Sequence, residues 1–106
     1  MIRDRKERFA VGINCWLETL AGMYCVTTLN LSETGVAVSA SDPLQEGMIV
    51  VLRFFTPFSA EPLAVRGEIV WSRSGPDGAM GIRFLDIDAE AKEKLRYTSM
   101  MVRARS

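Results

Sequence analysis

The alternation of apolar and polar residues along most of the chain constrains its fold more than any other feature. Val11, Ile13, Cys15 and Leu17 share one side of an extended segment, and mainly polar residues or glycine occupy the other side. Successive side chains of a strand point to opposite faces, so a period of two predicts a half-buried strand. Similar signals recur as far as residue 85. The larger part of the chain is therefore predicted to be a β-structure.

Turn-forming residues divide this region into short strands. We expect strands over residues 11–17, 23–29, 36–39, 48–55, 63–71 and 79–85, because Gly, Pro, Asn, Asp and Ser gather between these segments. Gly67 interrupts the fifth segment, where we expect a bulge or bend. About six short antiparallel strands predict a small barrel over residues 9–85, since closure removes exposed sheet edges.

The period changes after residue 88 to that of a helix. Asp88 is a suitable N-cap, and the small or apolar residues Ala91, Leu95, Thr98 and Val102 recur at helical spacing. We expect an amphipathic helix over residues 88–104 that packs on the barrel. The chain of 106 residues has the size of a single domain, residues 1–106. The predicted fold is mainly all-β, a six-stranded antiparallel barrel with a C-terminal helix.

The composition argues against several classes of function. The chain contains no histidine, which removes Ser-His-Asp and Cys-His catalysis and His-ligated zinc, so an enzyme is the weakest interpretation. Its 13 basic and 13 acidic residues give no net charge. A barrel of the OB type that binds single-stranded nucleic acid needs a basic groove with aromatic platforms, which this balance does not favour.

Neither a membrane span nor a signal peptide is expected, because no apolar run approaches about 18 residues. We therefore expect a cytoplasmic protein with reduced thiols and no membrane insertion. Cys15 and Cys25 are expected to be small buried residues, which the first hairpin could place opposite each other.

Two segments go beyond what the fold alone requires. The first is a basic arm over residues 1–8, in which Arg3, Arg5, Lys6 and Arg8 lie close together. Guanidinium groups fit phosphate oxygens and the O6/N7 edge of guanine in a bidentate manner. Taken alone, such an arm is typical of a flexible, solvated terminus.

The second segment is Asn30-Leu31-Ser32-Glu33-Thr34-Gly35. Asn and Ser cap turns with their side chains, and glycine tolerates unusual backbone angles. Such a turn can also present backbone N–H groups and short polar side chains to a ligand. Taken alone, the segment is typical of a good turn between two strands.

Together, the two segments resemble the motifs of the PilZ domain family, which binds the bacterial second messenger cyclic di-GMP. That family carries RxxxR before its first strand and (D/N)xSxxG further along the chain. Asn30, Ser32 and Gly35 match the second motif at every defined position, and Arg8 matches the last arginine of the first. Asp4 stands where the first motif has its other arginine. The resemblance extends over about residues 3–98.

The resemblance implies a receptor or adaptor, with cyclic di-GMP as its ligand and no other cofactor. Arg3, Arg5 and Arg8 would neutralise the phosphates and contact guanine. Asn30 and Ser32 would bond to guanine or phosphate atoms, and Gly35 would allow close approach of the backbone.

Trp71 is expected beside this site, where it packs against a guanine, against the arm, or only against the barrel. Binding would order the arm and change the surface offered to a partner protein, without involving a nucleic-acid polymer. The alternative is a degenerate PilZ domain that has lost nucleotide binding and serves as a protein-interaction module, which Asp4 favours.

Overall fold

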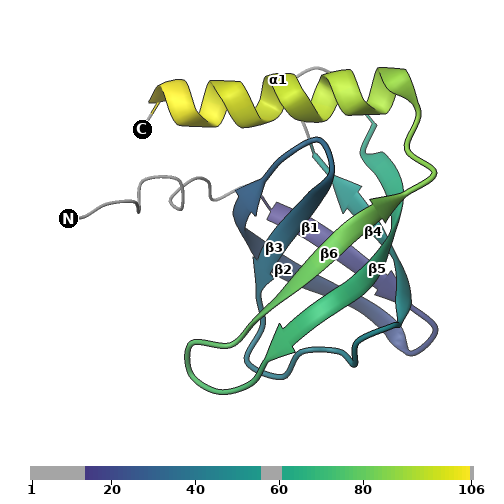
Figure 1. Ribbon diagram of the computed structural model, residues 1–106, viewed down its shortest axis with the longest axis vertical. Helices are drawn as coiled ribbons and strands as arrows, with labels where there is room; N and C mark the ends of the chain where they lie inside the picture. The colour runs from purple at the N-terminus through teal and green to yellow at the C-terminus, as the bar shows by residue number, and fades with distance from the viewer. Residues whose placement is uncertain (1–13, 56–60, 106) are drawn as a thin grey trace.

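The barrel wall consists of six strands in the computed structural model, which describes residues 14–55 and 61–105. The strands are β1 (Asn14–Thr19), β2 (Gly22–Leu31), β3 (Gly35–Ser39), β4 (Ile49–Phe54), β5 (Leu63–Arg73) and β6 (Ala79–Leu85). They pair antiparallel in the order β1-β2-β3-β6-β5-β4, and β4 closes the barrel against β1 (Figure 1). The predicted fold class is confirmed.

The interior is built from the alternating apolar residues that the sequence indicates. Cys15 and Leu17 of β1 are fully buried, and β4 contributes Val50, Leu52 and Phe54. The rings of Phe54 and Phe84 meet edge to face, with their centroids 6.0 Å apart. Burial of these side chains supplies the main driving force for closure of the barrel.

Helix α1 (Ala89–Arg105) lies across one end of the barrel (Figure 1). It begins after Asp88, whose carboxylate accepts a hydrogen bond from the Ala91 N–H at 2.8 Å, as expected of an N-cap. Leu95 is fully buried and joins the core cluster of the barrel. The side chains of Thr98 and Val102 lie outside the described residues. In the described part of the chain, no helix has the length and apolar character needed to cross a membrane.

Three expectations from the sequence are wrong in detail. The fifth strand pairs regularly through Gly67, and its bulge lies between Ile69 and Trp71 instead. Cys25 is exposed, and it pairs with Trp16 across the hairpin, whereas Cys15 is buried and pairs with Val26. The two thiols differ because consecutive strand positions face opposite sides of the barrel wall.

The third difference concerns the segment from Asn30 to Gly35. Strand β2 continues through Asn30 and Leu31, so the turn is confined to the residues between Leu31 and Gly35. The expected start of the first strand, at residues 11–13, lies outside the described residues.

Candidate functional site

Asn30 and Trp71, which the sequence singles out, lie at the two ends of one row across the outer wall of the barrel. Asn30 of β2 pairs with Ala37 of β3, Ala37 pairs with Gly81 of β6, and Gly81 pairs with Trp71 of β5. Neighbouring strands are about 4.8 Å apart, so this row spans about 14 Å along the curved wall. Asn30 and Trp71 form its ends, and two very small residues form its middle.

Two β-bulges turn the ends of this row outward. The pairing of β2 with β3 shifts at Leu29, and the pairing of β5 with β6 shifts at Val70. Strict alternation from the buried Thr28 and Ile69 would direct Asn30 and Trp71 into the barrel. The extra residue in each strand reverses the alternation, so both side chains face the exterior.

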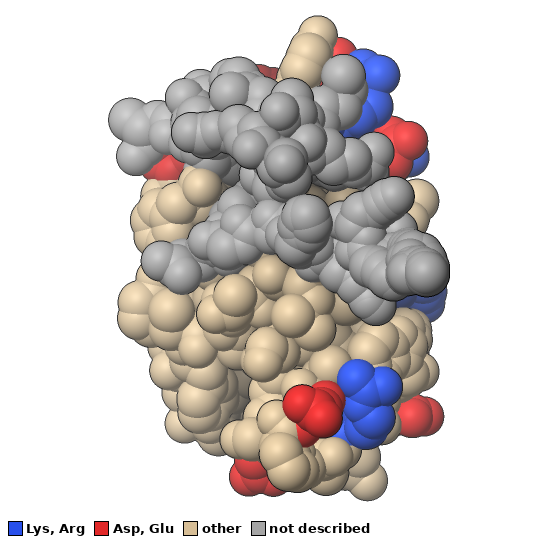
Figure 2. Space-filling view, turned by 90° about the vertical axis from the view of Figure 1, so that its left-hand side faces the viewer, with Lys and Arg blue, Asp and Glu red and all other residues tan. Residues whose placement is uncertain are grey.

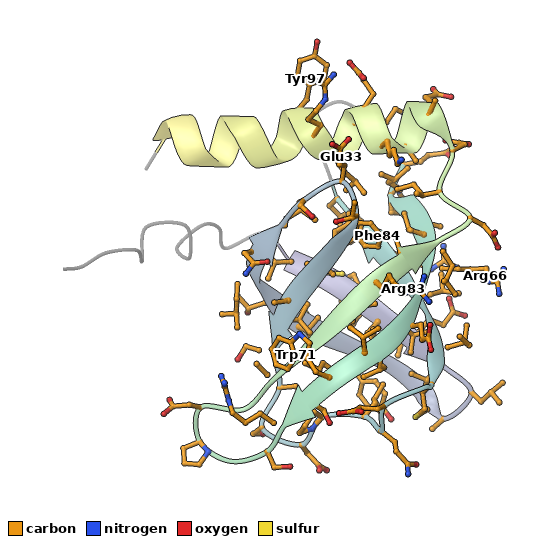
Figure 3. The ribbon with its side chains drawn as sticks, in the orientation of Figure 1. Glu33, Arg66, Trp71, Arg83, Phe84 and Tyr97 are labelled. Atoms are coloured by element: carbon orange, nitrogen blue, oxygen red, sulfur yellow. The ribbon has the colours of Figure 1, made fainter. Side chains whose placement is uncertain are left out.

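Trp71 covers the backbone of Gly81. A Cβ atom at Gly81 would lie 2.0 Å from Nε1 of Trp71, so only glycine leaves room for the indole there. The Trp71 side chain is nevertheless 40% exposed. Figure 3 shows it on the barrel wall, away from the end that α1 covers. Trp71 is thus a partly exposed barrel aromatic.

Small side chains leave two adjoining hollows on this wall. One has a volume of about 360 Å³ and is lined by Asn30, Ser32, Gly35 and Trp71, among others. The second has a volume of about 520 Å³ and shares Asn30, Ala37 and Trp71 with the first. Figure 2 views the side that lies on the left in Figure 1, where the lower surface is largely uncharged and charged atoms gather near its lower edge. Arg3, Arg5 and Arg8 lie outside the described residues.

Within the motif turn, Ser32 has a structural role. Its hydroxyl oxygen accepts a hydrogen bond from the Thr34 N–H at 3.2 Å and donates to the Gly35 carbonyl at 3.3 Å. The Ser32 N–H also donates to the Gly35 carbonyl at 3.0 Å. These bonds hold the turn in a fixed shape at the rim of the smaller hollow.

Gly35 is required by the close approach of two strands. A Cβ atom at this position would lie 2.6 Å from the carbonyl oxygen of Ile82 in β6. The fold alone therefore explains this glycine, and an approaching ligand is not needed to account for it.

Asn30 differs from Ser32 and Gly35, because no structural contact of its side chain is seen among the described residues. It is exposed, and its amide has no hydrogen-bond partner among the residues that the structure describes. An amide carries two donors and one acceptor, which suits the edge of a purine base. Asn30 is the motif residue most directly available to a ligand.

The motif turn also lies near helix α1. Glu33 sits in the turn beneath the helix (Figure 3). The pKa of the Arg96 guanidinium is raised, first by its hydrogen bond with Glu93 and to a smaller extent by the charge of Glu33. The carboxylate of Glu33 in the turn thus adds a small favourable charge interaction with Arg96 of the helix.

Two further residues, Arg73 and Arg83, line the hollows, although the sequence analysis did not select them. Arg83 forms an ion pair with Glu68, and Arg73 lies over the ring of Trp71. The sequence does place Arg73 beside Trp71, because it stands two positions further along the same strand and such residues share one face.

The chain belongs to the PilZ domain family, whose model matches residues 2–99. Several solved structures are similar to it, including the following three. The inhibitor of motility MotI/DgrA of Bacillus subtilis shares 15% identity at a TM-score of 0.74, over 100% of this chain and 54% of its own. The PilZ domain of Escherichia coli YcgR, solved with c-di-GMP, shares 14% identity at a TM-score of 0.71, over 96% of this chain and 94% of its own.

The PilZ domain of CeSA from a cellulose-synthesizing bacterium shares 20% identity at a TM-score of 0.60, over 83% of this chain and 89% of its own. A search of curated proteins gave no match. At these identities the structural neighbours establish the fold alone, and membership of the family rests on the match of its model.

Proposed function

We propose that this chain is a cytoplasmic receptor for cyclic di-GMP and regulates a partner protein. The observation that carries the proposal is the exposed Asn30 amide, which lines the same two hollows as Trp71. An exposed amide supplies base-edge contacts, and the exposed part of an indole supplies an apolar contact surface. PilZ domains are regulatory binding domains, which favours a receptor over an enzyme.

The phosphates of the ligand need positive charge. We assign this role to Arg3, Arg5 and Arg8, which the family match includes. If ligand binding orders the arm over the two hollows, the surface offered to a partner changes. The contacts with the ligand must then outweigh the conformational entropy that the arm loses. One structural neighbour is named an inhibitor of motility, which makes motility a process to test.

A titration of the full chain with cyclic di-GMP, with GTP and cyclic AMP as controls, tests the proposal. We expect micromolar or tighter binding that Arg8→Ala weakens at least tenfold. Asn30→Ala should weaken binding to a similar degree without changing the melting temperature, because the Asn30 side chain bonds to none of the residues that the structure describes. Gln45→Ala removes an exposed amide remote from both hollows and should leave binding unchanged.

The alternative is a degenerate PilZ domain that acts only through protein contacts. Asp4 in the arginine motif favours it, as does the fact that the fold alone accounts for Ser32 and Gly35. Absence of binding by a well-folded sample at high protein concentration would establish this alternative and overturn the receptor.

A further inference from the structure

The larger hollow continues beyond the PilZ motif residues toward Arg73. One row along from Asn30 and Trp71, Ser39 of β3 pairs with Ala79 of β6, and Ala79 pairs with Arg73 of β5. Arg73 and Trp71 line this hollow together with Asn30. A ligand seated between Asn30 and Trp71 therefore has a cationic side chain within its reach.

The guanidinium of Arg73 is fixed in place by uncharged groups. Its Nε and Nη2 atoms donate to the Asp77 carbonyl at 3.3 and 3.2 Å. Its Cζ atom lies 6.0 Å from the centroid of the Trp71 ring. These contacts orient the side chain and leave its remaining N–H groups available, since a guanidinium carries five.

Arg73 forms no ion pair with the residues that the structure describes. The other arginines whose side chains are described, Arg53, Arg66, Arg83 and Arg96, each form an ion pair with a carboxylate. Arg73 has no carboxylate partner within residues 14–55 and 61–97, and its contact with Asp77 is to the backbone oxygen. Among the described residues, the larger hollow therefore holds a positioned cation that forms no ion pair, although the acidic residue Asp77 lines the same hollow.

We propose that Arg73 forms a phosphate subsite of the nucleotide site, outside the two motifs of the family. Its free N–H groups donate to a phosphate oxygen of cyclic di-GMP, while Trp71 and the Asp77 carbonyl hold the guanidinium. Arginine favours such an oxygen because its planar fork makes charge-assisted bonds. This inference rests on the proposed function, since it names a second point of charge recognition at the same site.

The test compares Arg73→Gln with Arg66→Gln in the full chain, by calorimetric titration with cyclic di-GMP at 50 and 300 mM NaCl. Both variants remove one exposed guanidinium, and Arg66 lies away from both hollows, paired with Asp86. We expect Arg73→Gln to weaken binding about tenfold and to reduce its dependence on salt, because a charge contact is lost. Arg66→Gln should bind as the wild type does.

Two further variants separate phosphate binding from a purely structural role. Arg73→Lys keeps the positive charge but loses the planar guanidinium that donates to the Asp77 carbonyl. It should therefore recover part of the affinity that Arg73→Gln loses. Asp77→Asn keeps the carbonyl and removes a carboxylate from the hollow, so it should bind two- to threefold more tightly. Melting curves verify that each variant is folded.

The outcomes distinguish the two proposals. If the wild type and Asn30→Ala behave as expected but Arg73→Gln matches Arg66→Gln, the phosphate subsite is wrong and the receptor stands. If Arg73→Lys binds no better than Arg73→Gln, the assignment to phosphate is likewise wrong. If the wild type binds no cyclic di-GMP, both the proposed receptor function and the proposed phosphate subsite are wrong.

Discussion

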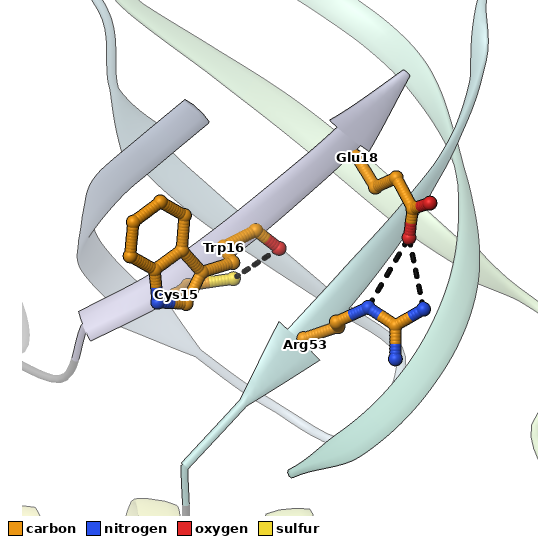
Figure 4. A network of polar contacts seen from close by, with 4 residues as sticks. All are labelled: Cys15, Trp16, Glu18 and Arg53. Carbon is orange, nitrogen blue, oxygen red and sulfur yellow. Dashed lines mark hydrogen bonds and ion pairs between the residues drawn. The ribbon is translucent and has the colours of Figure 1, made fainter. Parts of the chain in front are cut away.

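Two parts of the barrel wall each carry a tryptophan and an arginine, yet their electrostatic states differ. On one, Trp16 of β1 pairs with Arg53 of β4, and Arg53 holds the Glu18 carboxylate at 2.9 Å (Figure 4). On the other, Arg73 lies over Trp71 and has no carboxylate partner among the described residues. Similar residues therefore make a neutral structural contact in one place and a candidate anion site in the other.

The surfaces around the two pairs differ as well. Beside Trp71, the outward positions of β3 and β6 hold Gly35, Ala37, Ser39, Ala79 and Gly81, so the wall is hollowed. Beside Trp16, the outward residues include Glu18, Cys25 and Arg53. An anionic ligand needs both a cation without an ion pair and a hollow beside it. Among the described residues, only the wall around Trp71 combines the two.

The largest expected effect is that of Gly35→Ala on the stability of the hollowed wall around Trp71. The new methyl group would meet the Ile82 carbonyl at 2.6 Å, and a backbone atom cannot move aside cheaply. We expect a loss of about 2–3 kcal/mol in the free energy of unfolding, measured by urea denaturation. Gly67→Ala would cost a similar amount by overpacking, because its Cβ would lie 2.5 Å from Cγ2 of the buried, β-branched Ile82 and 3.3 Å from the Arg83 carbonyl. A loss below about 1 kcal/mol at Gly35 would contradict the backbone explanation.

A carboxylate placed beside Arg73 should remove the electrostatic difference between the two parts of the wall. Ser39→Glu brings an acid into the hollow that Ser39 and Arg73 line, and so imitates the Glu18–Arg53 pair. We expect affinity for cyclic di-GMP to fall at least tenfold, because Arg73 becomes paired and the hollow becomes negative. Ser39→Gln has a similar size without the charge and is the control. Equal affinities of the two variants would show that size, and not charge, limits binding.

The wall near Trp16 has its own titratable group, the buried thiol of Cys15. Burial raises the pKa of Cys15 from 9.0 to about 12. In the unfolded chain this thiol ionises near its ordinary pKa, whereas in the folded chain it stays protonated. Its contribution to stability is therefore complete below pH 9 and is lost as the pH rises from 9 toward 12.

Comparison with Cys15→Val isolates this effect. Between pH 8 and pH 10, the wild type should lose about 1 kcal/mol more of its free energy of unfolding than the variant does. Urea denaturation at the two pH values measures the difference. An identical loss in both proteins would show that Cys15 does not titrate as its burial requires.

The smallest effects should come from removing single carboxylates. Glu18→Gln frees Arg53 and should cost about 0.5 kcal/mol of stability, because both side chains are partly exposed. It should leave nucleotide affinity unchanged. Glu68→Gln frees Arg83, which lines the smaller hollow, and should tighten binding about twofold. A gain in affinity from Glu18→Gln would show that general charge, and not position, governs binding.

The strand pattern and the motif were readable from the sequence for a physical reason. Burial of one face of a strand requires apolar and polar residues to alternate. The alternation around Cys15 and Leu17 therefore predicts that both side chains lie in the core. Asp88 likewise predicts the start of α1, because capping depends only on neighbouring residues. Asn30, Ser32 and Gly35 identify the motif turn by their spacing alone.

The tertiary structure decided which way the ends of the site face. Alternation alone would direct Asn30 and Trp71 inward, and the bulges at Leu29 and Val70 turn them out. The position of a bulge depends on the pairing between strands that are distant in the sequence, so the glycine at position 67 was a misleading signal. The free charge of Arg73 likewise follows from which carboxylates lie near it. Local chemistry thus determined the elements of this protein, and pairing across the closed barrel determined which side chains its outer wall presents.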